Sequence, residues 1–398
     1  MEKNNEEKIK QLLSRGVSEI IVKDNLEKRL LSDEKIRLYL GVDPTGTALH
    51  LGHAVLLRKL QEFLELGHEV ILLIGDFTAK IGDPTGKDTT RVPLTDVQIK
   101  ANFKDYKKQA SKILDFSGVK IRHNSRWLSK LRFADILELS GHFTVQQMLH
   151  REMFDRRIKE NAPISVTEFM YPLMQGYDSV AMDVDLEIGG NDQMFNMLCG
   201  RTLQKAYRNK DKDILTTKLL LGTDGRKMSK TYNNAIYLND ASSEMFGKIM
   251  SIRDELIVDY FDLCTDVPYV EIENIKAISN PRDQKVLLAK EIVKMYHGEK
   301  EAKNAENEFN NMFRDGQIPA DIKIFETSKE NYPVLDLLFD SGLAESKNDA
   351  KRVIEGGGVT IKIKDQISKI KDWRAEIKIE NEMVVQFGKR KFVKIKLK

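Results

Sequence analysis

A strand, a turn, a helix and a second strand follow one another near the start of the chain. The apolar run from Ile36 to Val42 ends at a turn over residues 43–46, and apolar residues then recur at helical spacing from Ala54 to Leu66. Residues 70–74 have the length and composition of a buried strand. Two parallel strands joined by a right-handed helical crossover form the unit of an open α/β sheet. The pattern therefore predicts such a sheet, with ligands at the carboxyl ends of its strands.

A further strand is predicted from Asp185 to Ile188, and residues 189–192 then form a loop that begins a helix. This loop and the one after the first strand should open onto the same edge of the sheet. Residues 100–165 are charged and mostly helical in pattern, with Phe133 to Ile158 as the longest candidate helix. We therefore predict a sheet domain over residues 1–235 with a helical insertion near 110–165.

The rest of the chain divides into a helical segment and a mixed one. Helical periodicity resumes from Ser242 to Phe313, which predicts a helical domain over residues 236–320. After a polar connector, two short helices over residues 334–341 and 346–355 precede three glycines and short alternating strands. Residues 331–398 are therefore predicted to form a small α+β domain.

Composition excludes several classes of protein. The longest apolar stretches, such as residues 70–74, fall far short of the roughly 20 residues that cross a bilayer, so no membrane partner is expected. Residues 1–8 are polar and carry acids, unlike a secretory or transit segment, which predicts a cytoplasmic location. Cys199 and Cys264 are too few for a disulfide framework or a cysteine-based zinc site.

The net charge of +3 is unevenly distributed along the chain. Residues 331–398 hold 15 Lys and Arg against 10 Asp and Glu, a net charge of +5, which leaves −2 for residues 1–330. This excess of basic residues in the tail suits a polyanionic partner such as nucleic acid.

His50 and His53 lie three residues apart at the predicted start of the first helix, so both project from one face. Gly52 has no side chain, which leaves room for a flat ligand. Backbone N–H groups at a helix N-terminus attract anions, and imidazoles donate hydrogen bonds to phosphate oxygens. Two other interpretations stay open. One histidine caps the helix while the other packs, which is commoner for such a pair alone, or both bind a metal, for which no third ligand is evident nearby.

A second candidate stretch runs from Gly222 to Thr231 and contains Lys227 and Lys230 on either side of a small polar residue. Two glycines in the stretch favour a mobile loop, and two ammonium groups suit closure over a polyphosphate. Taken alone, the same stretch is also typical of an ordinary solvated loop.

Three polar residues form a third candidate site. Tyr171, Gln175 and Asp178 stand at positions i, i+4 and i+7, which share one face of a helix. Pro172 fits best in a first helical turn, so the start of this helix is ambiguous. A polar stripe on an apolar helix is costly unless it is satisfied, so it indicates either a bound polar ligand or a buried hydrogen-bond network.

The histidine pair and the lysine loop together resemble the two signatures of class I aminoacyl-tRNA synthetases. His50-Leu51-Gly52-His53 corresponds to HIGH, and Lys227-Met228-Ser229-Lys230-Thr231 corresponds to KMSKS, with Thr231 keeping the hydroxyl of the usual serine. The resemblance implies a Rossmann-like catalytic domain that uses ATP. His50 and His53 would stabilise the transition-state phosphate, and Lys227, Lys230 and Thr231 would close on the departing pyrophosphate with Mg²⁺, without dedicated metal ligands from the protein.

A further resemblance concerns the amino acid. Tyr39 and the stretches 82–87, 169–178 and 189–193 together resemble bacterial tyrosyl-tRNA synthetases, which implies tyrosine, ATP and tRNA(Tyr) as substrates. The family assigns roles to the matching positions as follows: Tyr39 and Asp178 hold the phenolic hydroxyl of tyrosine; Asp83, Tyr171 and Gln175 hold its ammonium group; Gln193 lines the amino-acid pocket; Asp192 meets the ribose; Gly52 lies against the nucleotide; Lys87 and Arg91 contact the pyrophosphate. Phenylalanine would leave the buried groups around the hydroxyl unpaired, so such a site needs no editing domain.

The tail resembles the S4 RNA-binding fold at the carboxyl end of these enzymes. Lys347, Lys351 and Arg352 lie near one face of a predicted helix, which three glycines follow, and the resemblance implies that they bind RNA. A solvated charged helix is the alternative. The family also implies an anticodon-binding role for residues 236–320 and a homodimer formed through the insertion.

Two rival functions remain. A tryptophanyl-tRNA synthetase shares the fold and both signatures, but the phenol-binding residues and the S4-like tail argue against it. An RNA-binding protein without catalytic activity is the other alternative, and the intact histidine and lysine pairs argue against that.

Overall fold

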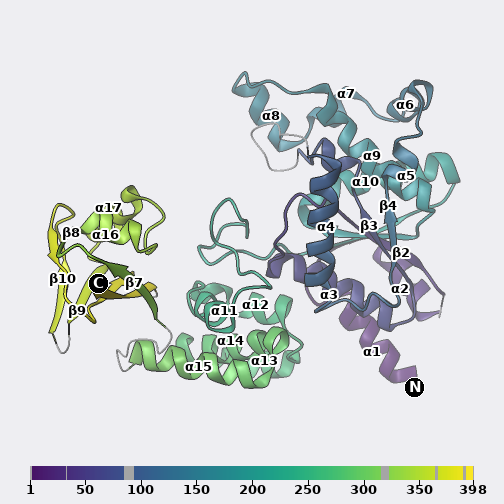
Figure 1. Ribbon diagram of the computed structural model, residues 1–398. Helices are drawn as coiled ribbons and strands as arrows, with labels where there is room; N and C mark the ends of the chain where they lie inside the picture. The colour runs from purple at the N-terminus through teal and green to yellow at the C-terminus, as the bar shows by residue number, and fades with distance from the viewer. Residues whose placement is uncertain are drawn as a thin grey trace. The chain divides into compact units, whose positions relative to one another are not determined.

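The computed structural model describes residues 2–32, 34–84, 94–314, 322–363, 366–388 and 391–397. The chain divides into two compact units, residues 1–303 and residues 304–398 (Figure 1). Lys87 and Arg91, which the family resemblance assigns to the pyrophosphate, lie outside the described residues. In the described ranges, no helix is both long enough and apolar enough to cross a membrane.

The first unit is built on a six-stranded sheet in the order β1-β6-β5-β2-β3-β4, in which β2 to β6 run parallel and β1 pairs antiparallel with β6 at one edge. The strands are β1 Val17–Ile21, β2 Arg37–Val42, β3 Glu69–Ile74, β4 Lys120–His123, β5 Leu186–Gly190 and β6 Asp213–Thr217. The three strands predicted from the sequence are confirmed as β2, β3 and β5. Their apolar runs are continuous because both faces of a parallel sheet are covered.

Helices surround this sheet and continue beyond it. The α-helices of the first unit are α1 Glu2–Leu12, α2 Lys23–Leu31, α3 Leu51–Glu65, α4 Asp96–Ala110, α5 Ser125–Leu128, α6 Phe133–Ser140, α7 Val145–Leu149, α8 Glu152–Lys159, α9 Val166–Met182, α10 Met194–Arg208, α11 Ser242–Met250, α12 Ile257–Cys264, α13 Tyr269–Lys276 and α14 Pro281–His297. The short 3₁₀ segments are η1 Thr78–Lys80, η2 Asn191–Gln193 and η3 Asp254–Leu256, and α15 Glu299–Arg314 crosses the boundary between the units.

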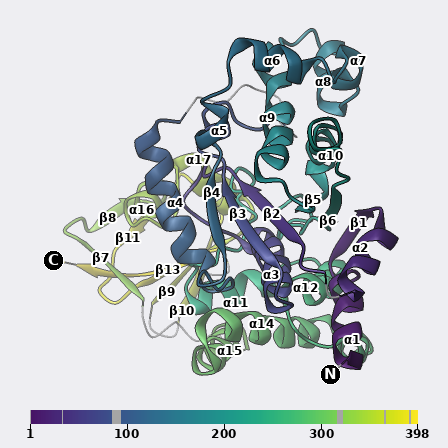
Figure 2. The same cartoon turned by 90° about the vertical axis from the view of Figure 1, so that its right-hand side faces the viewer.

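The crossovers reverse direction between β5 and β2. Helix α3 joins β2 to β3 and α4 joins β3 to β4, whereas α10 joins β5 to β6 in the opposite direction along the sheet. Because such crossovers are right-handed, α10 covers the other face, where it lies beside α9 (Figure 2). The point of reversal is where open α/β sheets bind ligands, at the carboxyl ends of β2 and β5.

The predicted helical insertion near 110–165 is only partly helical. It contains β4, a strand of the main sheet, and four short helices, α5 to α8, take the place of the single long helix expected over Phe133 to Ile158. Gly141 ends α6, and the Thr144 hydroxyl accepts the backbone N–H of Gln147 at 3.2 Å to cap α7. The apolar periodicity of the sequence continues across residues 141–144, but the helix itself ends at Gly141 and a new one begins after Thr144.

The predicted boundary at residue 235 falls inside the first unit. Helix α12 packs on α3 of the sheet region, and Arg58 of α3 donates a hydrogen bond to the Thr265 carbonyl at 2.8 Å. The Tyr260 hydroxyl of α12 likewise donates to the Leu221 carbonyl at 2.7 Å. The helical segment therefore belongs to the same compact unit as the sheet, and its separate role stays a prediction.

The second unit combines two helices with a five-stranded sheet in the order β10-β9-β12-β13-β7 and a two-stranded sheet of β8 and β11. Its elements are α16 Val334–Asp340, α17 Lys347–Glu355, β7 Lys323–Thr327, β8 Asn331–Pro333, β9 Val359–Ile363, β10 Gln366–Ile370, β11 Glu376–Lys378, β12 Val384–Phe387 and β13 Lys391–Leu397. Both predicted helices are confirmed. The unit starts earlier than residue 331, because β7 pairs with β13.

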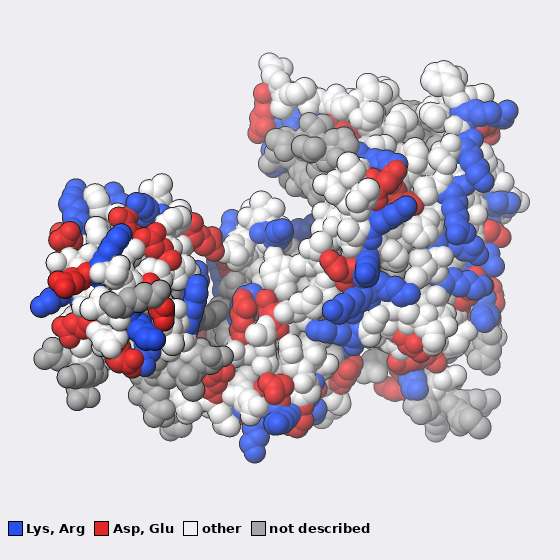
Figure 3. Space-filling model, in the orientation of Figure 1, with Lys and Arg blue, Asp and Glu red and all other residues white. Residues whose placement is uncertain are grey.

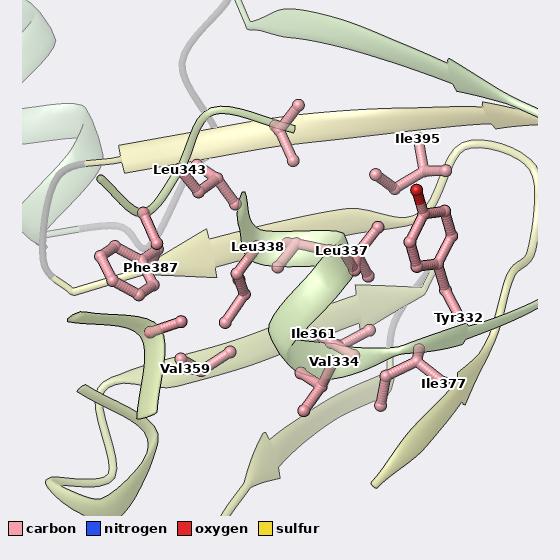
Figure 4. Close-up of a cluster of buried hydrophobic side chains, with 14 of the residues drawn as sticks. Tyr332, Val334, Leu337, Leu338, Leu343, Val359, Ile361, Ile377, Phe387 and Ile395 are labelled. Atoms are coloured by element: carbon pink, nitrogen blue, oxygen red, sulfur yellow. The ribbon is translucent and has the colours of Figure 1, made fainter. Parts of the chain in front are cut away.

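A separate hydrophobic core holds the second unit together. Leu337 and Leu338 of α16 are fully buried and face Val359, Phe387 and Ile395 of the sheet (Figure 4). An independent core of this kind is what allows a part of a chain to fold as a unit of its own.

Candidate active site

Backbone hydrogen bonds join the start of α3, where the histidine signature lies, to the segment just after the lysine loop. The Leu51 N–H donates to the Ile236 carbonyl at 3.0 Å, and the Leu238 N–H donates to the Leu49 carbonyl at 2.8 Å. His50 also forms an isolated β-bridge with Tyr237. The segment that follows the lysine loop is therefore joined by backbone hydrogen bonds to the start of α3.

The two histidines lie against each other at the first turn of α3. Their ring centroids are 3.9 Å apart, and the His50 backbone N–H donates to Nδ1 of His53 at 3.2 Å. Because Nδ1 of His53 accepts, the proton of its neutral ring is on Nε2, which is then a donor. A Cβ at Gly52 would approach the His50 ring to 3.1 Å, so glycine is the residue that leaves this ring uncrowded.

Both imidazoles are neutral at physiological pH. Burial lowers the pKa of His50 to about 2 and that of His53 to about 4, and the nearby positive charge of Lys227 contributes to both shifts. Each ring therefore offers an N–H donor instead of a positive charge, and the Nδ1 acceptor of His53 is already used by the His50 backbone N–H. The distance of 3.9 Å between the ring centroids confirms that the two side chains lie together. Their role toward phosphate stays a prediction.

We expect the ring protons of His50 and His53 not to titrate between about pH 5.5 and 8 in the ligand-free protein, because both pKa values lie below that window. NMR titration of the imidazole resonances, assigned with single-histidine variants, measures this. In urea both should titrate near the ordinary value of about 6.5. The unfolded chain thus takes up protons that the folded one does not, so stability falls as the pH drops below about 6.5. A midpoint near 6.5 for either folded ring would contradict the assignment.

The lysine loop is a turn organised by buried residues. Met228 is buried, and the side chain of buried Asn234 accepts the Ser229 N–H at 2.8 Å and donates to the Lys227 carbonyl at 3.1 Å. Gly225 has φ +83°, in the left-handed region that favours glycine. The loop therefore has a defined ligand-free conformation, from which the Lys227, Lys230 and Thr231 side chains are exposed.

One lysine of this loop reaches across to the residue predicted to meet the ribose. Lys227 Nζ lies 2.5 Å from Asp192 Oδ2, and Asp192 belongs to the loop after β5. Four of the predicted site residues, His50, His53, Lys227 and Asp192, are thus brought together by three separate parts of the chain. Together they present two ring donors, a cation and a carboxylate, which is a set suited to a nucleotide.

Helix α9 carries the polar stripe that the sequence predicts, with one difference at its start. The helix begins at Val166, so Pro172 lies inside it and not in its first turn. The Ser165 hydroxyl caps the helix, and Glu168 forms a buried ion pair with Arg157 at 2.7 Å. The helix start is fixed by a local capping box, in which the Ser165 backbone N–H donates to Glu168 at 2.9 Å, and the position of Pro172 obscures this signal in the sequence.

Asp178 and Tyr171 are held in one hydrogen-bond chain on the sheet side of α9. Asp178 accepts from Trp127 Nε1 at 2.7 Å and from Asn124 Nδ2 at 3.2 Å. Asn124 also donates to Thr78, Thr78 donates to Asp43, and the Tyr171 hydroxyl donates to Asp43 Oδ2 at 2.9 Å. Both interpretations of the polar stripe therefore stay open: Tyr171 and Asp178 take part in a buried hydrogen-bond network, and the same groups suit a polar ligand.

A second chain of hydrogen bonds connects the other predicted tyrosine-binding residues. The Tyr39 hydroxyl lies 3.0 Å from Ser179 Oγ, and both residues are fully buried. Ser179 also accepts from Lys212, which is paired with Glu187. The chain then continues through Gln175, Asn196 and Gln193 to Asp83, with the last bond, from Gln193 Nε2 to Asp83 Oδ2, at 2.7 Å.

Burial dominates the electrostatics of the phenols and of Asp178. It raises the pKa of Tyr39 and Tyr171 well above the ordinary value, and the nearby carboxylates raise them further, so both phenols keep their protons. Burial also raises the pKa of Asp178 well above its usual range, while the hydrogen bonds from Trp127 and Asn124 act in the opposite direction. A ligand hydroxyl here would meet groups that have been removed from water.

Sequence reasoning missed most of the residues that hold the site together. Trp127 and Asn124 come from the segment after β4, Ser179 and Glu187 from α9 and β5, and Lys212 is the residue just before β6. The local sequence carries no signal for Trp127 or Asn124. It carries none for Lys212 either, because the buried strand that follows this lysine is not predicted from the sequence.

The three basic residues predicted to bind RNA lie on or beside α17 of the second unit, and each has an acidic neighbour. Lys347 pairs with Asp336 at 2.5 Å, Arg352 with Asp349 at 2.7 Å, and Lys351 with Glu355 at 4.0 Å. Figure 3 shows basic and acidic side chains intermixed on the drawn face of this unit. Exposed pairs of this kind are weak, so they still leave the cations available to a stronger polyanion.

A tryptophan that the sequence analysis did not single out lies beside these residues. Lys351 Nζ is 4.5 Å and the Arg374 guanidinium carbon 4.1 Å from the centroid of the Trp373 ring. Aromatic rings close to cations are suited to contacts with nucleic-acid bases.

Solved structures share the fold of this chain. The C-terminally truncated mitochondrial tyrosyl-tRNA synthetase of Aspergillus nidulans superposes with a TM-score of 0.64 at 24% identity, covering 77% of this chain and 94% of that one. The tyrosyl-tRNA synthetase of Archaeoglobus fulgidus, determined in complex with L-tyrosine, gives a TM-score of 0.60 at 25% identity and covers 75% of this chain and 99% of that one.

Sequence comparison is more specific. Residues 31–314 match the family described as tRNA synthetases class I (W and Y). The tyrosine–tRNA ligase of Thermotoga maritima is 45% identical over 98% of this chain and 97% of its own length. That of Photobacterium profundum is 46% identical over 97% of this chain and 98% of its own length. The chain therefore belongs to the class I tRNA synthetases of the W and Y type, and within them to the family of bacterial tyrosine–tRNA ligases.

Proposed function

We propose that this protein activates tyrosine with ATP to form tyrosyl-adenylate, releases pyrophosphate, and transfers the tyrosyl group to the 3′ end of tRNA(Tyr). The observation that carries the proposal is twofold: Lys227 of the second signature pairs with Asp192 in the loop after β5, and residues 236–238 are bonded to residues 49–51 at the first signature. The near full-length similarity to bacterial tyrosine–tRNA ligases supports the same function.

In the first step the tyrosine carboxylate attacks the α-phosphorus of ATP, a carboxylate–phosphorus bond forms, and the bond to the bridging oxygen of pyrophosphate breaks. The nucleophile is already ionised, so positioning and charge stabilisation supply the catalysis. His50 and His53 donate hydrogen bonds to the transferring phosphate, and Lys227, Lys230 and Thr231 bind the pyrophosphate as it leaves. In the second step a terminal ribose hydroxyl of the tRNA takes the tyrosyl group and AMP departs.

Mg²⁺ enters this scheme as part of the nucleotide substrate. In the described ranges, no group of three or more His, Cys, Asp and Glu side chains is placed to hold a metal ion. Mg²⁺ commonly binds through substrate phosphates with few protein ligands. The carboxylate of Asp192, now paired with Lys227, is assigned to the ribose and not to the metal.

Tyrosine specificity is assigned to the buried groups around Tyr39 and Asp178. Asp83, Tyr171 and Gln175 hold the ammonium group, Gln193 lines the pocket, and Gly52, Lys87 and Arg91 lie along the nucleotide. This assignment distinguishes the protein from a tryptophanyl enzyme, because it provides an acceptor for a phenolic hydroxyl in place of an indole pocket.

An ATP–pyrophosphate exchange assay with single amino acids tests both the function and this assignment. The wild-type protein should exchange with tyrosine and not with tryptophan or phenylalanine. In Asp178→Asn the preference for tyrosine over phenylalanine should fall by on the order of 10-fold or more, because the buried acceptor is lost. Asp211→Asn, an exposed change, is the matched control. A folded Asp178→Asn protein with full discrimination would mean that another residue recognises the hydroxyl.

The RNA partner is assigned to the C-terminal part of the chain. We assign the S4-like role to the second unit, with Lys347, Lys351 and Arg352 as phosphate contacts, and an anticodon-binding role to the helical segment within residues 236–320. The net charge of +5 over residues 331–398 supports the first assignment.

A homodimer in the cytoplasm completes the proposal. The insertion of the first unit exposes large apolar side chains, with Phe133 75%, Val145 65% and Val166 71% accessible. Large apolar side chains left this accessible support an interface with a second protein surface. The same segment is the one for which the family resemblance implies dimer contacts.

A further inference from the structure

Lys212 and Glu187 form a buried ion pair between α9, α10 and the sheet. The Lys212 side chain is fully buried and that of Glu187 is 3% exposed. Lys212 Nζ also donates to Ser179 Oγ at 2.9 Å. A Cβ on Gly200 of α10 would lie 2.4 Å from that Nζ, so the packing leaves room for the ammonium group only because this position is glycine.

The pair adjoins both ends of the site assigned to tyrosine. On one side, Ser179 links Lys212 to the hydroxyl of Tyr39, which lies 3.0 Å from Ser179 Oγ. On the other side, Glu187 Oε1 accepts from Nε2 of Gln175 at 3.0 Å. The pair is therefore linked to a phenol-assigned residue through Ser179 and bonded directly to an ammonium-assigned one, Gln175.

The contact with Glu187 determines which atom of Gln175 is free to bind a cation. A carboxylate only accepts hydrogen bonds, so it selects the NH₂ group of Gln175 and turns Oε1 away from itself. Oε1 accepts from Asn196 Nδ2 at 3.0 Å and keeps a second acceptor position. An ammonium group has donors only, so it binds this amide in one orientation and is repelled by the other.

We propose that Lys212 and Glu187 are positioning residues of the amino-acid site, which orient the amide of Gln175 for the substrate ammonium group without touching the substrate. The proposal rests on the proposed function, because Gln175 is assigned to that group there. Net stabilisation is a weak explanation for the pair, since buried ion pairs are often replaceable by apolar residues without loss of stability.

The test compares ligands that differ in the ammonium group. In Glu187→Gln the new amide donates to Gln175 when its oxygen faces Lys212, which turns the Gln175 NH₂ group toward the site. Tyrosine and tyramine, which carry the ammonium group, should bind on the order of 10-fold or more weakly than to wild type. 3-(4-Hydroxyphenyl)propionate, which lacks it, should bind equally well to both proteins. Binding is measured by calorimetry, and kcat of exchange at saturating tyrosine should change less than KM.

Two further variants keep the test decisive. The double variant Lys212→Met, Glu187→Leu removes both charges of the pair, so neither is left buried without a partner. It should show the same selective loss and replaces Glu187→Gln in the test if that protein does not fold. Glu168→Gln breaks a second buried ion pair, between Glu168 of α9 and Arg157, and should lower the melting temperature without changing the ratio of the affinities for tyrosine and the propionate.

Each result has one meaning. Equal weakening of all three ligands in a folded Glu187 variant would show a merely structural role and overturn the proposal, as would unchanged affinities. Failure of the wild-type protein to bind or activate tyrosine would instead overturn the proposed function, so the two failures are distinguishable.

Discussion

Replacing His50 or His53 by alanine is expected to slow tyrosyl-adenylate formation on the order of 10²-fold or more while KM for tyrosine stays nearly unchanged. Both rings lie at the first turn of α3, whereas the residues assigned to tyrosine come from α9, β2 and the loop after β5. A donor that acts on the phosphate in the transition state contributes to the rate and little to ground-state binding of the amino acid. Single-turnover measurement of adenylate formation is the direct readout.

The same helix supplies a matched control. His68 lies just beyond the other end of α3, is 9% exposed, and packs against Phe63 with ring centroids 5.8 Å apart. His68→Ala removes an imidazole of similar burial at a distance from the phosphate site and should leave the rate of adenylate formation within a few-fold of wild type. Near-normal rates in both His50→Ala and His53→Ala would remove these residues from the mechanism.

A chain that ends at Arg314 is expected to keep tyrosine activation and to lose most of its tRNA charging. The cut removes the strands and helices of the second unit with their own core and leaves α15 whole. A cut after Tyr332 would instead strand β7 without its partner β13 and expose the buried ring of Tyr332. Small substrates need only the first unit, whereas tRNA needs its phosphates neutralised by the second.

Exchange and aminoacylation are compared for full-length and truncated protein at two salt concentrations. Binding of tRNA releases the salt cations that accompany its phosphates, so added salt opposes binding. Charging by the full-length protein should therefore weaken steeply with added salt, and charging by the truncated protein should depend on salt less steeply. Normal charging by the truncated form would show that the second unit does not bind tRNA. Loss of exchange as well would show that the catalytic site depends on the removed residues.

Much of the sheet was predictable because its strands are buried on both faces. Strands β2 and β3 are continuous apolar runs, and Leu38, Leu40 and Leu72 are at most 3% exposed. Strand β6 escaped prediction because Asp213, Thr216 and Thr217 are polar yet fully buried. The hydrogen-bond partners of Asp213 and Thr216 come from distant parts of the chain, and the sequence near β6 does not indicate which residues they are.

In the candidate site, too, some residues were predictable from the sequence and others were not. Positions such as His50 and Asp178 were predictable because the chemistry of the ligand restricts the residue type at each of them. Trp127, Asn124 and Lys212 were not predicted, because each acts by satisfying another buried group. That need arises only once the sheet and α9 have come together, so no spacing along the chain records it.

The backbone bonds that join residues 49–51 to residues 236–238 also decide when the site can exist during synthesis. These segments lie almost half the chain length apart, and the first emerges from the ribosome long before the second. Contacts between distant segments form only after the chain between them has been made and ordered. A nascent chain therefore has its histidine pair but not the complete proposed nucleotide site until translation has passed residue 238, and on this proposal a prematurely terminated product is unable to consume ATP there.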